Sequence, residues 1–438
     1  MQVILLAAGQ STRLDPIADK NTLEFLGKPL IEHQISALKK ANMRDIVVVA
    51  NKFNIEKITA ILKKYKNVVV VEQEKLEDGM AGGVLAGSKI VKHKNILIMS
   101  TNDVFDQTLF DDIIRASKTK GVDGVIAGKE MNEYFSGGYL KIDGNSLITD
   151  IIEKPGEGKE PSKLVNLVCH IYNDFPKLID YLKKTKSKKD DTYEVALDNY
   201  IKKGKAKMLA LKYKGFWQPL KYPWDVISLM NHFLANQDPK IDKTAKISKT
   251  AIVKDNVIIG PNVKIFDHAV VQGPAYIGEG SVIANNALVR SSMIGRNCVV
   301  GFATEVARSY LNHNVWSHTN YIGDSIIDDN VSFGAGTVIG NLRFDEEYVK
   351  VSIQGKRGCS GTNKFGAVIG HGVRFGINSS TNPGVKIGQN VFVGANVLVD
   401  KDIPNDKMVL LDQKLKVVTN KKAVSMADRS EMKKKLKK

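Results

Sequence analysis

Hydrophobic residues follow two different periods along the chain, and the change falls near residue 230. Before it, short aliphatic runs such as QVILLAA and DIVVVAN alternate with amphipathic stretches such as PLIEHQISALKKAN. Aliphatic runs of this length, separated by helix-like segments, are typical of βαβ units and a mainly parallel sheet. The first half is therefore predicted to be an α/β domain of the Rossmann-like kind. Its ligands should bind beyond the carboxyl ends of the strands, where LAAGQSTR, VEQEKLEDGMAGG and STND fall.

From Ile241 onward an aliphatic residue recurs at every sixth position. The unbroken series has nine members, at Ile241, Ile247, Val253, Ile259, Ile265, Val271, Ile277, Ile283 and Val289. After a slip of one residue it resumes at Ile294 and continues, with interruptions, to Val399. A six-residue period predicts one short strand and one turn per repeat, with the aliphatic side chain pointing into a prism. This pattern resembles the hexapeptide repeats of left-handed parallel β-helices, whose members commonly form trimers.

The two periods predict how the chain is divided into segments. These are a nucleotide-binding type of α/β domain over residues 1–228, a linker over 229–240, a β-helix over 241–404 and a basic tail over 405–438.

Composition narrows the class of protein. The chain has 438 residues, so two domains are expected, and its formal net charge is +17. From Gln413 to the end, ten Lys or Arg and two acids give +8, which places nearly half of the excess in a tail that we interpret as solvated. No apolar stretch approaches 18 residues, so we expect a cytoplasmic protein with no membrane contact. Because the excess charge is concentrated in a solvated tail, we expect no specific nucleic acid as a partner. The three cysteines, Cys169, Cys298 and Cys359, show no paired spacing and are expected to be buried thiols.

The first strand ends in LAAGQSTRLDP, and Lys20 follows four residues later. A glycine-rich turn after a strand presents backbone N–H groups to an anion, and cationic side chains just beyond it neutralise phosphate. The stretch lacks the GKS or GKT ending of a P-loop and is not GxGxxG. These absences exclude the generic ATPase and dinucleotide-binding motifs.

The longer stretch LAAGQSTRLDPIADKNTLEFLGKPLIEHQI resembles the signature of sugar-1-phosphate nucleotidylyltransferases. The six residues between Arg13 and Lys20 are similar to the gap in N-acetylglucosamine-1-phosphate uridylyltransferases. The resemblance implies that Arg13 and Lys20 are catalytic and act on the reacting phosphates, and that Mg²⁺ is bound. The other implied residues are Ala8, Gly9, Gln73 and Gly79 for the nucleotide, Gly138, Glu153, Lys154 and Asn166 for the sugar phosphate, and Asp103 and Asp225 for the metal.

Three departures from that family bear on specificity and metal binding. Glu77 replaces a glycine near the base, and Val168 replaces an asparagine that would touch the sugar. In FWQPLKYPWD the second metal-binding aspartate of the family falls on Pro219, so Asp225 is expected to substitute for it. The sequence leaves open which sugar is used, and whether the nucleotide is UTP or dTTP.

A second resemblance lies within the repeats. HTNYIGD, FGAGT and GNLRFD are similar to the acetyltransferase segment of bifunctional enzymes that acetylate glucosamine 1-phosphate and uridylylate the product, especially archaeal-type relatives. It implies that His318 is the general base toward acetyl-CoA. It also implies that Arg290 and Tyr321 hold the sugar phosphate while Asn341 and Lys364 flank the reaction. Ala307 and Ser332 depart from the expected sugar contacts.

We therefore predict a homotrimeric bifunctional transferase that joins a nucleoside triphosphate and a sugar 1-phosphate and N-acetylates an amino-sugar phosphate. Two alternatives remain. Ala307 and Ser332 leave room for a single-activity nucleotidylyltransferase with a structural or regulatory β-helix. Pro219 and Glu77 leave room for a non-catalytic nucleotide- or sugar-binding protein.

Overall fold

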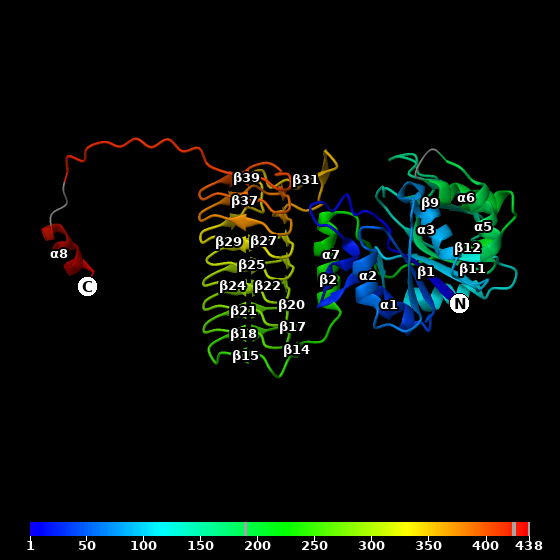
Figure 1. Cartoon of the computed structure of the whole chain (residues 1–438), viewed down its shortest axis with the longest axis horizontal. Coiled ribbons are helices and arrows are strands. Elements are labelled where there is room, and N and C mark those ends of the chain that lie inside the picture. Colours follow the sequence, from blue (N-terminus) through cyan, green and yellow to red (C-terminus); the bar gives the residue numbers. More distant parts are fainter. Residues whose placement is uncertain (188–190, 423–425, 437–438) are drawn as a thin grey trace.

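A computed structural model of the chain describes residues 1–187, 191–422 and 426–436. An α/β domain lies beside a tall stack of short strands, and helix α7 (Pro223–Ala235) lies between them (Figure 1). Both halves of the sequence therefore adopt the two classes of fold that their periods predict.

The α/β domain is built on a nine-stranded sheet whose four neighbouring strands β6, β1, β4 and β5 are parallel. Alternate residues of β1 serve opposite faces, since Val3 and Leu5 enter one buried cluster while Ile4 enters the other. The sheet strands are β1 (Gln2–Leu6), β4 (Ile46–Ala50), β5 (Val68–Glu72), β6 (Ile96–Ser100), β8 (Gly124–Glu130), β9 (Gly138–Ile142), β10 (Ile148–Glu153), β11 (Leu164–Tyr172) and β12 (Met208–Lys212).

Helices cover the sheet, and short strands and turns carry the loops at its edge. The helices are α1 (Leu30–Lys40), α2 (Ile55–Leu62), α3 (Gly79–Ser88), α4 (Thr108–Ser117), α5 (Phe175–Lys184) and α6 (Thr192–Lys202). The small elements are the 3-10 turns Lys20–Thr22 and Leu76–Asp78 and the strand pairs β2 (Glu24–Phe25) with β3 (Lys28–Pro29) and β7 (Asp103–Phe105) with β13 (Trp217–Pro219).

The second half is a parallel β-helix with three strands in each regular coil, and each strand pairs with the strand of the same face in the next coil, which in the first coils is three places further along. The first face contains β14 (Lys240–Ile241), β17 (Val257–Ile259), β20 (Ala275–Ile277), β23 (Met293–Ile294), β26 (Tyr310–Leu311), β28 (Ile326–Ile327), β33 (Val368–Ile369) and β36 (Lys386–Ile387). The second face contains β15 (Lys246–Ile247), β18 (Lys264–Ile265), β21 (Val282–Ile283), β24 (Val299–Val300), β29 (Ser332–Phe333), β34 (Arg374–Phe375), β37 (Phe392–Val393) and β39 (Met408–Val409). The third face contains β16 (Ile252–Lys254), β19 (Val270–Gln272), β22 (Leu288–Arg290), β25 (Glu305–Ala307), β27 (Tyr321–Gly323), β30 (Val338–Ile339), β35 (Ser380–Thr381) and β38 (Leu398–Val399).

The one-residue slip in the period has a structural cause at the corner between the third and first faces. There the buried residues are five apart instead of six, as from Val289 to Ile294. Three buried serines stack at this corner, and the hydroxyl of Ser292 accepts the N–H of Ser309 at 3.0 Å, as Ser309 accepts that of Ser325 at 3.1 Å. The hydroxyls replace hydrogen bonds that the shortened turn cannot make.

The α/β domain packs on the first face of the β-helix through α7 and a shared apolar cluster. Leu229, Met230 and Leu234 of α7 are buried there. Residues 229–235 of the expected linker are therefore helical, and their buried apolar side chains fill the gap between the domains. Arg296 of the β-helix also pairs with Glu24, at 2.7 Å.

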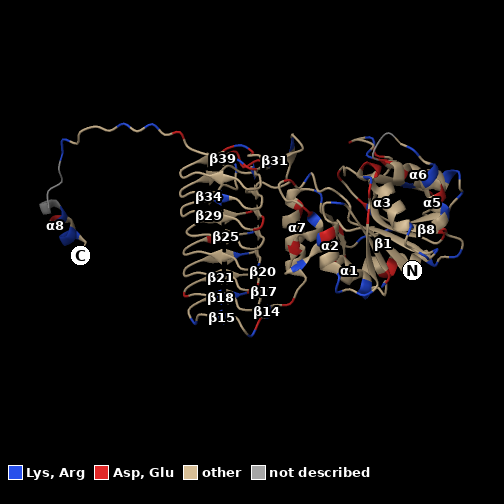
Figure 2. Ribbon diagram, viewed as in Figure 1, with Lys and Arg blue, Asp and Glu red and all other residues tan. Residues whose placement is uncertain are grey.

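The tail and the cysteines complete the fold. Residues 410–422 are almost all exposed, and they lead away from the β-helix to α8 (Met426–Lys435), which carries several Lys and Arg (Figures 1 and 2). Cys169 and Cys298 are buried as expected, but Cys359 is exposed because it lies on the hairpin of β31 (Lys350–Ile353) and β32 (Lys356–Cys359). Among the described residues, no helix is both long and apolar enough to cross a bilayer.

Candidate active site

A cavity of about 610 Å³ opens at the carboxyl ends of β1, β5 and β6. The predicted residues that line it are Ala8, Gly9, Gln73, Gly79, Glu153 and Lys154. Val168, Glu77 and residues 192–194, at the start of α6, line it too. The structure thus brings together three loops that the sequence placed at separate strand ends.

Three asparagine side chains hold the glycine-rich loop through hydrogen bonds to its backbone carbonyl oxygens. Asn51 donates to the carbonyl oxygen of Ala8 at 2.8 Å, and Asn54 and Asn21 donate to that of Ala7 at 3.0 and 3.1 Å. Because these carbonyl groups are bound on the protein side, the backbone that follows is fixed around Gly9. The sequence analysis missed all three, since a single asparagine in a loop carries no distinctive signal.

Lys20 lies over this loop. A side-chain carbon built on Gly9 would be 3.6 Å from Lys20 Nζ, so glycine leaves the ammonium group room beside the backbone. Burial lowers the pKa of Lys20 to about 8, although Asp103 and Asp19 nearby oppose the shift. Arg13 belongs to the same group of cations, and its guanidinium lies 5.9 Å from the centre of the Tyr222 ring. The arrangement can bind and neutralise a polyphosphate.

Gln73 is buried and organises the turn that follows β5. Its Nε2 donates to the carbonyl oxygens of Gly79 and Lys75, at 2.8 and 3.0 Å. Gly79 has a φ of +54°, a backbone conformation that residues with a Cβ rarely adopt. The structure therefore gives both residues a part in shaping the cavity wall on the side expected for the base.

The two carboxylates expected to bind metal have different surroundings. Asp103 Oδ1 accepts the indole N–H of Trp217 at 2.8 Å, while Oδ2 has no hydrogen-bond partner within the described part of the chain. Burial raises the pKa of Asp103 despite that hydrogen bond. Asp225 Oδ2 instead accepts the backbone N–H groups of Lys221 and Tyr222, both at 2.7 Å, and Oδ1 accepts from Gln218. Asp225 thus caps α7, and its expected role as a metal ligand stays a prediction.

A metal ion held mainly by substrate fits this geometry. No group of three or more His, Cys, Asp or Glu that could hold a metal occurs among the residues that the structure describes. Mg²⁺ commonly binds one or two carboxylates and completes its shell with phosphate oxygens and water. Asp103 Oδ2 offers one such ligand, so the site suits Mg²⁺ that is shared with a bound triphosphate.

Two expected sugar-phosphate residues, Glu153 and Lys154, line the cavity, and Gly138 and Asn166 lie behind Glu153. A Cβ on Gly138 would lie 3.0 Å from Glu153 Oε2 and 3.4 Å from the Cβ of Asn166, so these three residues are in contact. Asn166 also hydrogen-bonds His170, at 2.9 Å, and His170 bonds Tyr193 at 2.8 Å. Burial lowers the pKa of His170 to about 3, which keeps it neutral. This polar chain fixes Asn166 from behind.

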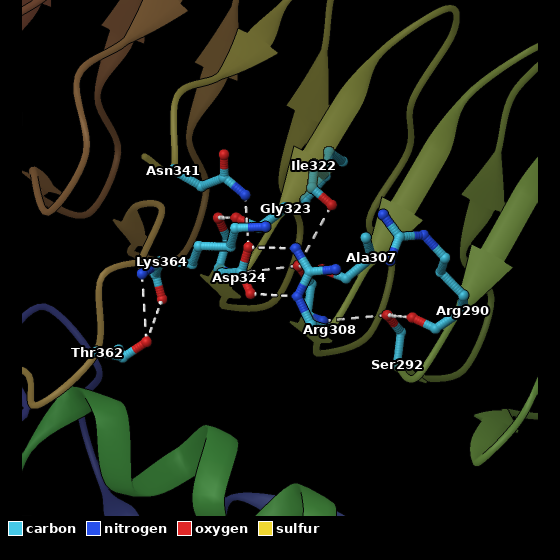
Figure 3. A network of polar contacts seen from close by, with 12 residues as sticks. Arg290, Ser292, Ala307, Arg308, Ile322, Gly323, Asp324, Asn341, Thr362 and Lys364 are labelled. Atoms are coloured by element: carbon cyan, nitrogen blue, oxygen red, sulfur yellow. Dashed lines mark hydrogen bonds and ion pairs between the residues drawn. The ribbon is translucent and has the colours of Figure 1, made fainter. Parts of the chain in front are cut away.

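Three residues expected for acetyl transfer, Arg290, Asn341 and Lys364, lie at the corner between the third and first faces of the β-helix (Figure 3), and Tyr321 reaches Asn341 from β27. Asn341 donates to Tyr321 at 3.1 Å and also to Asp324. Lys364 lies beside Asn341, because residue 342 and Lys364 form an antiparallel bridge. Arg290 lies on the same corner, paired with Glu305 at 2.6 Å.

Arg308 occupies the centre of this corner. Its guanidinium makes two hydrogen bonds of 2.6 Å to Asp324, next to the short side chain of Ala307 (Figure 3). Arg308, which follows Ala307 in the sequence, is therefore already paired with Asp324.

His318 lies at another corner of the β-helix. It is exposed at the corner between the second and third faces, where the chain enters β27, whereas Asp324 follows the end of β27. His318 therefore lies at the corner before the third face, while Asp324, which accepts from Asn341 and Arg308, lies at the corner after it.

Comparison with known proteins gives matches along the whole chain. A family model described as nucleotidyl transferase matches residues 2–220, and one described as GMPPB C-terminal domain matches residues 236–343. The bifunctional protein GlmU of Methanococcus maripaludis (strain S2) is 32% identical, over 96% of this chain and 100% of that protein. The bifunctional sugar-1-phosphate nucleotidylyltransferase/acetyltransferase of Sulfurisphaera tokodaii is also 32% identical, over 92% of this chain and 98% of that protein. The solved structure of UDP-glucose pyrophosphorylase complexed with UDP-glucose is 20% identical over 54% of this chain and 99% of that chain, with a TM-score of 0.47.

Proposed function

The chain belongs to the family of bifunctional sugar-1-phosphate nucleotidylyltransferase/acetyltransferases, and on this premise we propose which reaction each domain catalyses. The α/β domain transfers a nucleotidyl group from a nucleoside triphosphate to a sugar 1-phosphate, which gives a nucleoside diphosphate sugar and pyrophosphate. The observation that carries this proposal is a cavity lined by Gly9, Glu153 and Lys154, with the ammonium group of Lys20 beside Gly9 and the charge of Arg13 close to Lys20.

The chemistry follows from that arrangement. An oxygen of the sugar phosphate attacks the α-phosphorus, the bond from this phosphorus to the bridging oxygen breaks, and pyrophosphate leaves with the electron pair. Negative charge grows on the leaving group, and Lys20 and Arg13 stabilise it as preorganised cations. The loop held by Asn51 and Asn54 positions the triphosphate for in-line attack.

Magnesium is the proposed cofactor of this step. Asp103 would hold it through Oδ2, and the ion would add positive charge at the phosphates. The protein's own residues orient the two substrates and neutralise the remaining phosphate charge. Glu77 and Gln73 lie on the base side of the cavity and are proposed to favour UTP or dTTP.

A substrate matrix tests this proposal. Purified full-length protein is incubated with Mg²⁺ and each of the four triphosphates UTP, dTTP, GTP and ATP against several sugar 1-phosphates, and pyrophosphate release is measured. We expect release with UTP or dTTP and at least one sugar 1-phosphate. If no pair gives release, the α/β domain only binds its ligands, and the non-catalytic alternative replaces this proposal.

Acetyl transfer by the β-helix is the second candidate function. The corner cluster of Arg290, Tyr321, Asn341 and Lys364 supports it, with acetyl-CoA as the acetyl donor and His318 as the base that takes the proton of the attacking amine. His318 precedes β27, whereas Arg308 and Asn341 meet at Asp324 after its end, so we propose that a trimer brings His318 of one copy to the cluster of another. Exposed apolar side chains near His318 support such packing, since Phe302 is 57% exposed and Trp316 is 59% exposed.

The single-activity alternative makes a different prediction for the same assay. Thiol release from acetyl-CoA is followed with glucosamine 1-phosphate as acceptor, in the wild type and in His318→Ala. We expect release that falls about 100-fold in the variant, as for a lost general base. If the wild type releases no thiol with any amino-sugar phosphate while it sediments as a trimer, the β-helix has only a structural role.

A further inference from the structure

Lys221 was not expected in the site, yet its side chain lies at the edge of the sugar-phosphate region. The residue lies between β13 and α7, and its Nζ donates to the carbonyl oxygen of Ser136 at 3.1 Å. The same ammonium group lies 4.0 Å from the centre of the Phe135 ring. A Cβ on Gly137 would be 3.9 Å from Nζ, and Gly138 begins the strand that contacts Glu153 and Asn166.

The charged groups around Lys221 belong to both ends of the site. The charges of Asp103 and Arg13, on the phosphate side, influence the pKa of Lys221. The charges of Glu153, on the sugar side, and of Asp225, at the start of α7, influence it as well. Lys20 and Lys221 also act on each other. Burial lowers the pKa of Lys221 to about 8, so a large fraction remains cationic near neutral pH. Its ammonium group therefore bridges the region between the cations on the triphosphate and the sugar-phosphate contacts.

The backbone of Lys221 is fixed. Asp225 accepts its N–H at 2.7 Å, and that of Tyr222 at the same distance, which ties the turn to the first turn of α7. A lysine ammonium has three donors, and one of them is used by Ser136. Two donors remain for oxygens of a bound molecule.

The missing metal ligand explains why a cation is useful at this point. Pro219 has no side chain that can bind Mg²⁺, and Asp225 already accepts three hydrogen bonds as a cap, whereas Asp103 has an oxygen without a partner in the described part of the chain. A sugar phosphate that approaches a triphosphate adds negative charge to a region already rich in it. A fixed cation lowers this repulsion without a second metal ligand.

We propose that Lys221 binds the phosphate group of the sugar 1-phosphate and holds it against the α-phosphorus, where it supplies positive charge that a second metal-binding carboxylate would otherwise help to recruit. The proposal rests on nucleotidyl transfer as the function of the α/β domain. It makes Lys221 a catalytic residue that acts on the acceptor, whereas Lys20 and Arg13 act on the donor.

Lys129 provides a matched control. Its Nζ also donates to a backbone carbonyl group, that of Gly215 at 2.6 Å, and lies 5.7 Å from the centre of an aromatic ring, that of Tyr213. Unlike Lys221, it is not among the charges that act on Lys20, and Asp103, Arg13 and Glu153 surround Lys221 instead. A lysine that only supports a loop should behave as Lys129 does.

The experiment compares full-length wild type, Lys221→Met, Lys221→Arg and Lys129→Met. Initial rates of pyrophosphate release give kcat and KM for each substrate, and calorimetry measures binding of N-acetylglucosamine 1-phosphate and of N-acetylglucosamine. For Lys221→Met we expect kcat/KM for the sugar 1-phosphate to fall about 100-fold while KM for the triphosphate changes less than threefold. Affinity for the sugar phosphate should fall, and Lys221→Arg should recover at least a tenth of the wild-type kcat/KM. Lys129→Met should match the wild type.

The outcomes separate the two proposals. If Lys221→Met turns over and binds sugar phosphate as the wild type does, or if Lys129→Met loses as much, Lys221 only supports the 134–138 loop and the inference is wrong. If the wild type turns over no substrate pair, the proposed function fails. In that case Lys221 is a sugar-phosphate-binding residue without a catalytic role if Lys221→Met weakens binding of the sugar phosphate, and the inference falls entirely if binding is unchanged. Thermal denaturation reports whether Lys221→Met is folded.

Discussion

At the scale of single residues, Lys20 must stay charged in a place that disfavours charge. Burial lowers its pKa to about 8, and the nearby cations Lys221 and Arg13 act in the same direction, while Asp103 and Asp19 oppose them. A bound triphosphate adds negative charge, which favours the cation. The protonated fraction of Lys20 therefore depends on pH in the free enzyme and on substrate in the complex.

This balance predicts the pH dependence of the reaction. As pH rises through about 8, free Lys20 loses its proton, and so does Lys221, whose pKa is also about 8. We expect kcat/KM for the triphosphate to fall above pH 8, and kcat to fall only at higher pH, because the bound triphosphate raises both pKa values. Initial rates between pH 6 and 10 measure both limbs. A kcat/KM that stays constant to pH 10 would contradict the assignment of Lys20.

Asp103 gives a second prediction at this scale. Asp103→Asn keeps an oxygen for the Trp217 N–H but removes the negative charge that attracts Mg²⁺. We expect the Mg²⁺ concentration for half-maximal pyrophosphate release to rise at least tenfold, with little change in the melting temperature. EDTA should abolish wild-type activity. A wild type that is active in EDTA would show that no metal is required, and the role of Asp103 would then be structural.

Single residues also show what the sequence could not predict. Lys20 and Arg13 were found because their spacing along the chain is distinctive. Lys221 and Asp225 depend on how the turn before α7 packs against the 134–138 loop, and the sequence contains no periodic sign of that contact. A carboxylate in the sequence can be a metal ligand or a helix cap, and only the position of the nearby N–H groups decides between them.

At the scale of elements, the β-helix was the most predictable part of the chain. Each inward aliphatic residue marks one short strand, and the buried column from Val257 to Val399 repeats the period found in the sequence. The six-residue period does not predict the stacked serines at the shortened corner, because a serine in a turn cannot be told from any other small polar turn residue in the sequence. The hairpin of β31 and β32 is inserted into a coil, and its sequence does not follow the six-residue period.

The serine stack predicts a local cost in stability. Ser309→Ala removes the acceptor of the Ser325 N–H and leaves that buried group without a partner. The free energy of unfolding should fall by about 1–3 kcal/mol, measured by denaturant or thermal unfolding. Ser380→Ala, an outward position on the third face, is the control and should change it by less than about 0.5 kcal/mol. Equal values for the two variants would argue against the stack as a stabilising element.

At the scale of the whole molecule, the β-helix contacts the loop after β1 that carries Arg13. Gln354 of the β31–β32 hairpin donates to Thr12 at 3.0 Å, and Gln389 donates to the carbonyl oxygen of Pro16 at 3.0 Å. Arg296 holds Glu24 just beyond Lys20. The β-helix therefore supports the loop that carries Arg13 and Lys20, as well as its own corner cluster.

The separate core of the β-helix predicts that it can fold without the α/β domain. Its aliphatic column lies entirely within residues 257–399. A fragment from Ile241 to the C-terminus should therefore fold as a β-rich trimer, although its first face loses the cover of α7. Circular dichroism and sedimentation test this. A fragment that is unfolded or monomeric would show that the α/β domain is needed for folding or assembly.

The most direct test of the central claim is the turnover of Lys20→Ala in nucleotidyl transfer. Pyrophosphate release is measured at saturating Mg²⁺, triphosphate and sugar 1-phosphate, with the substrate pair that the wild type uses, and melting temperatures confirm that both proteins are folded. Because Lys20 is proposed to act as a preorganised cation on the reacting phosphates, we expect kcat to fall about 100-fold or more in a folded protein. Wild-type turnover in Lys20→Ala would contradict the claim that this cavity is the nucleotidyl-transfer site.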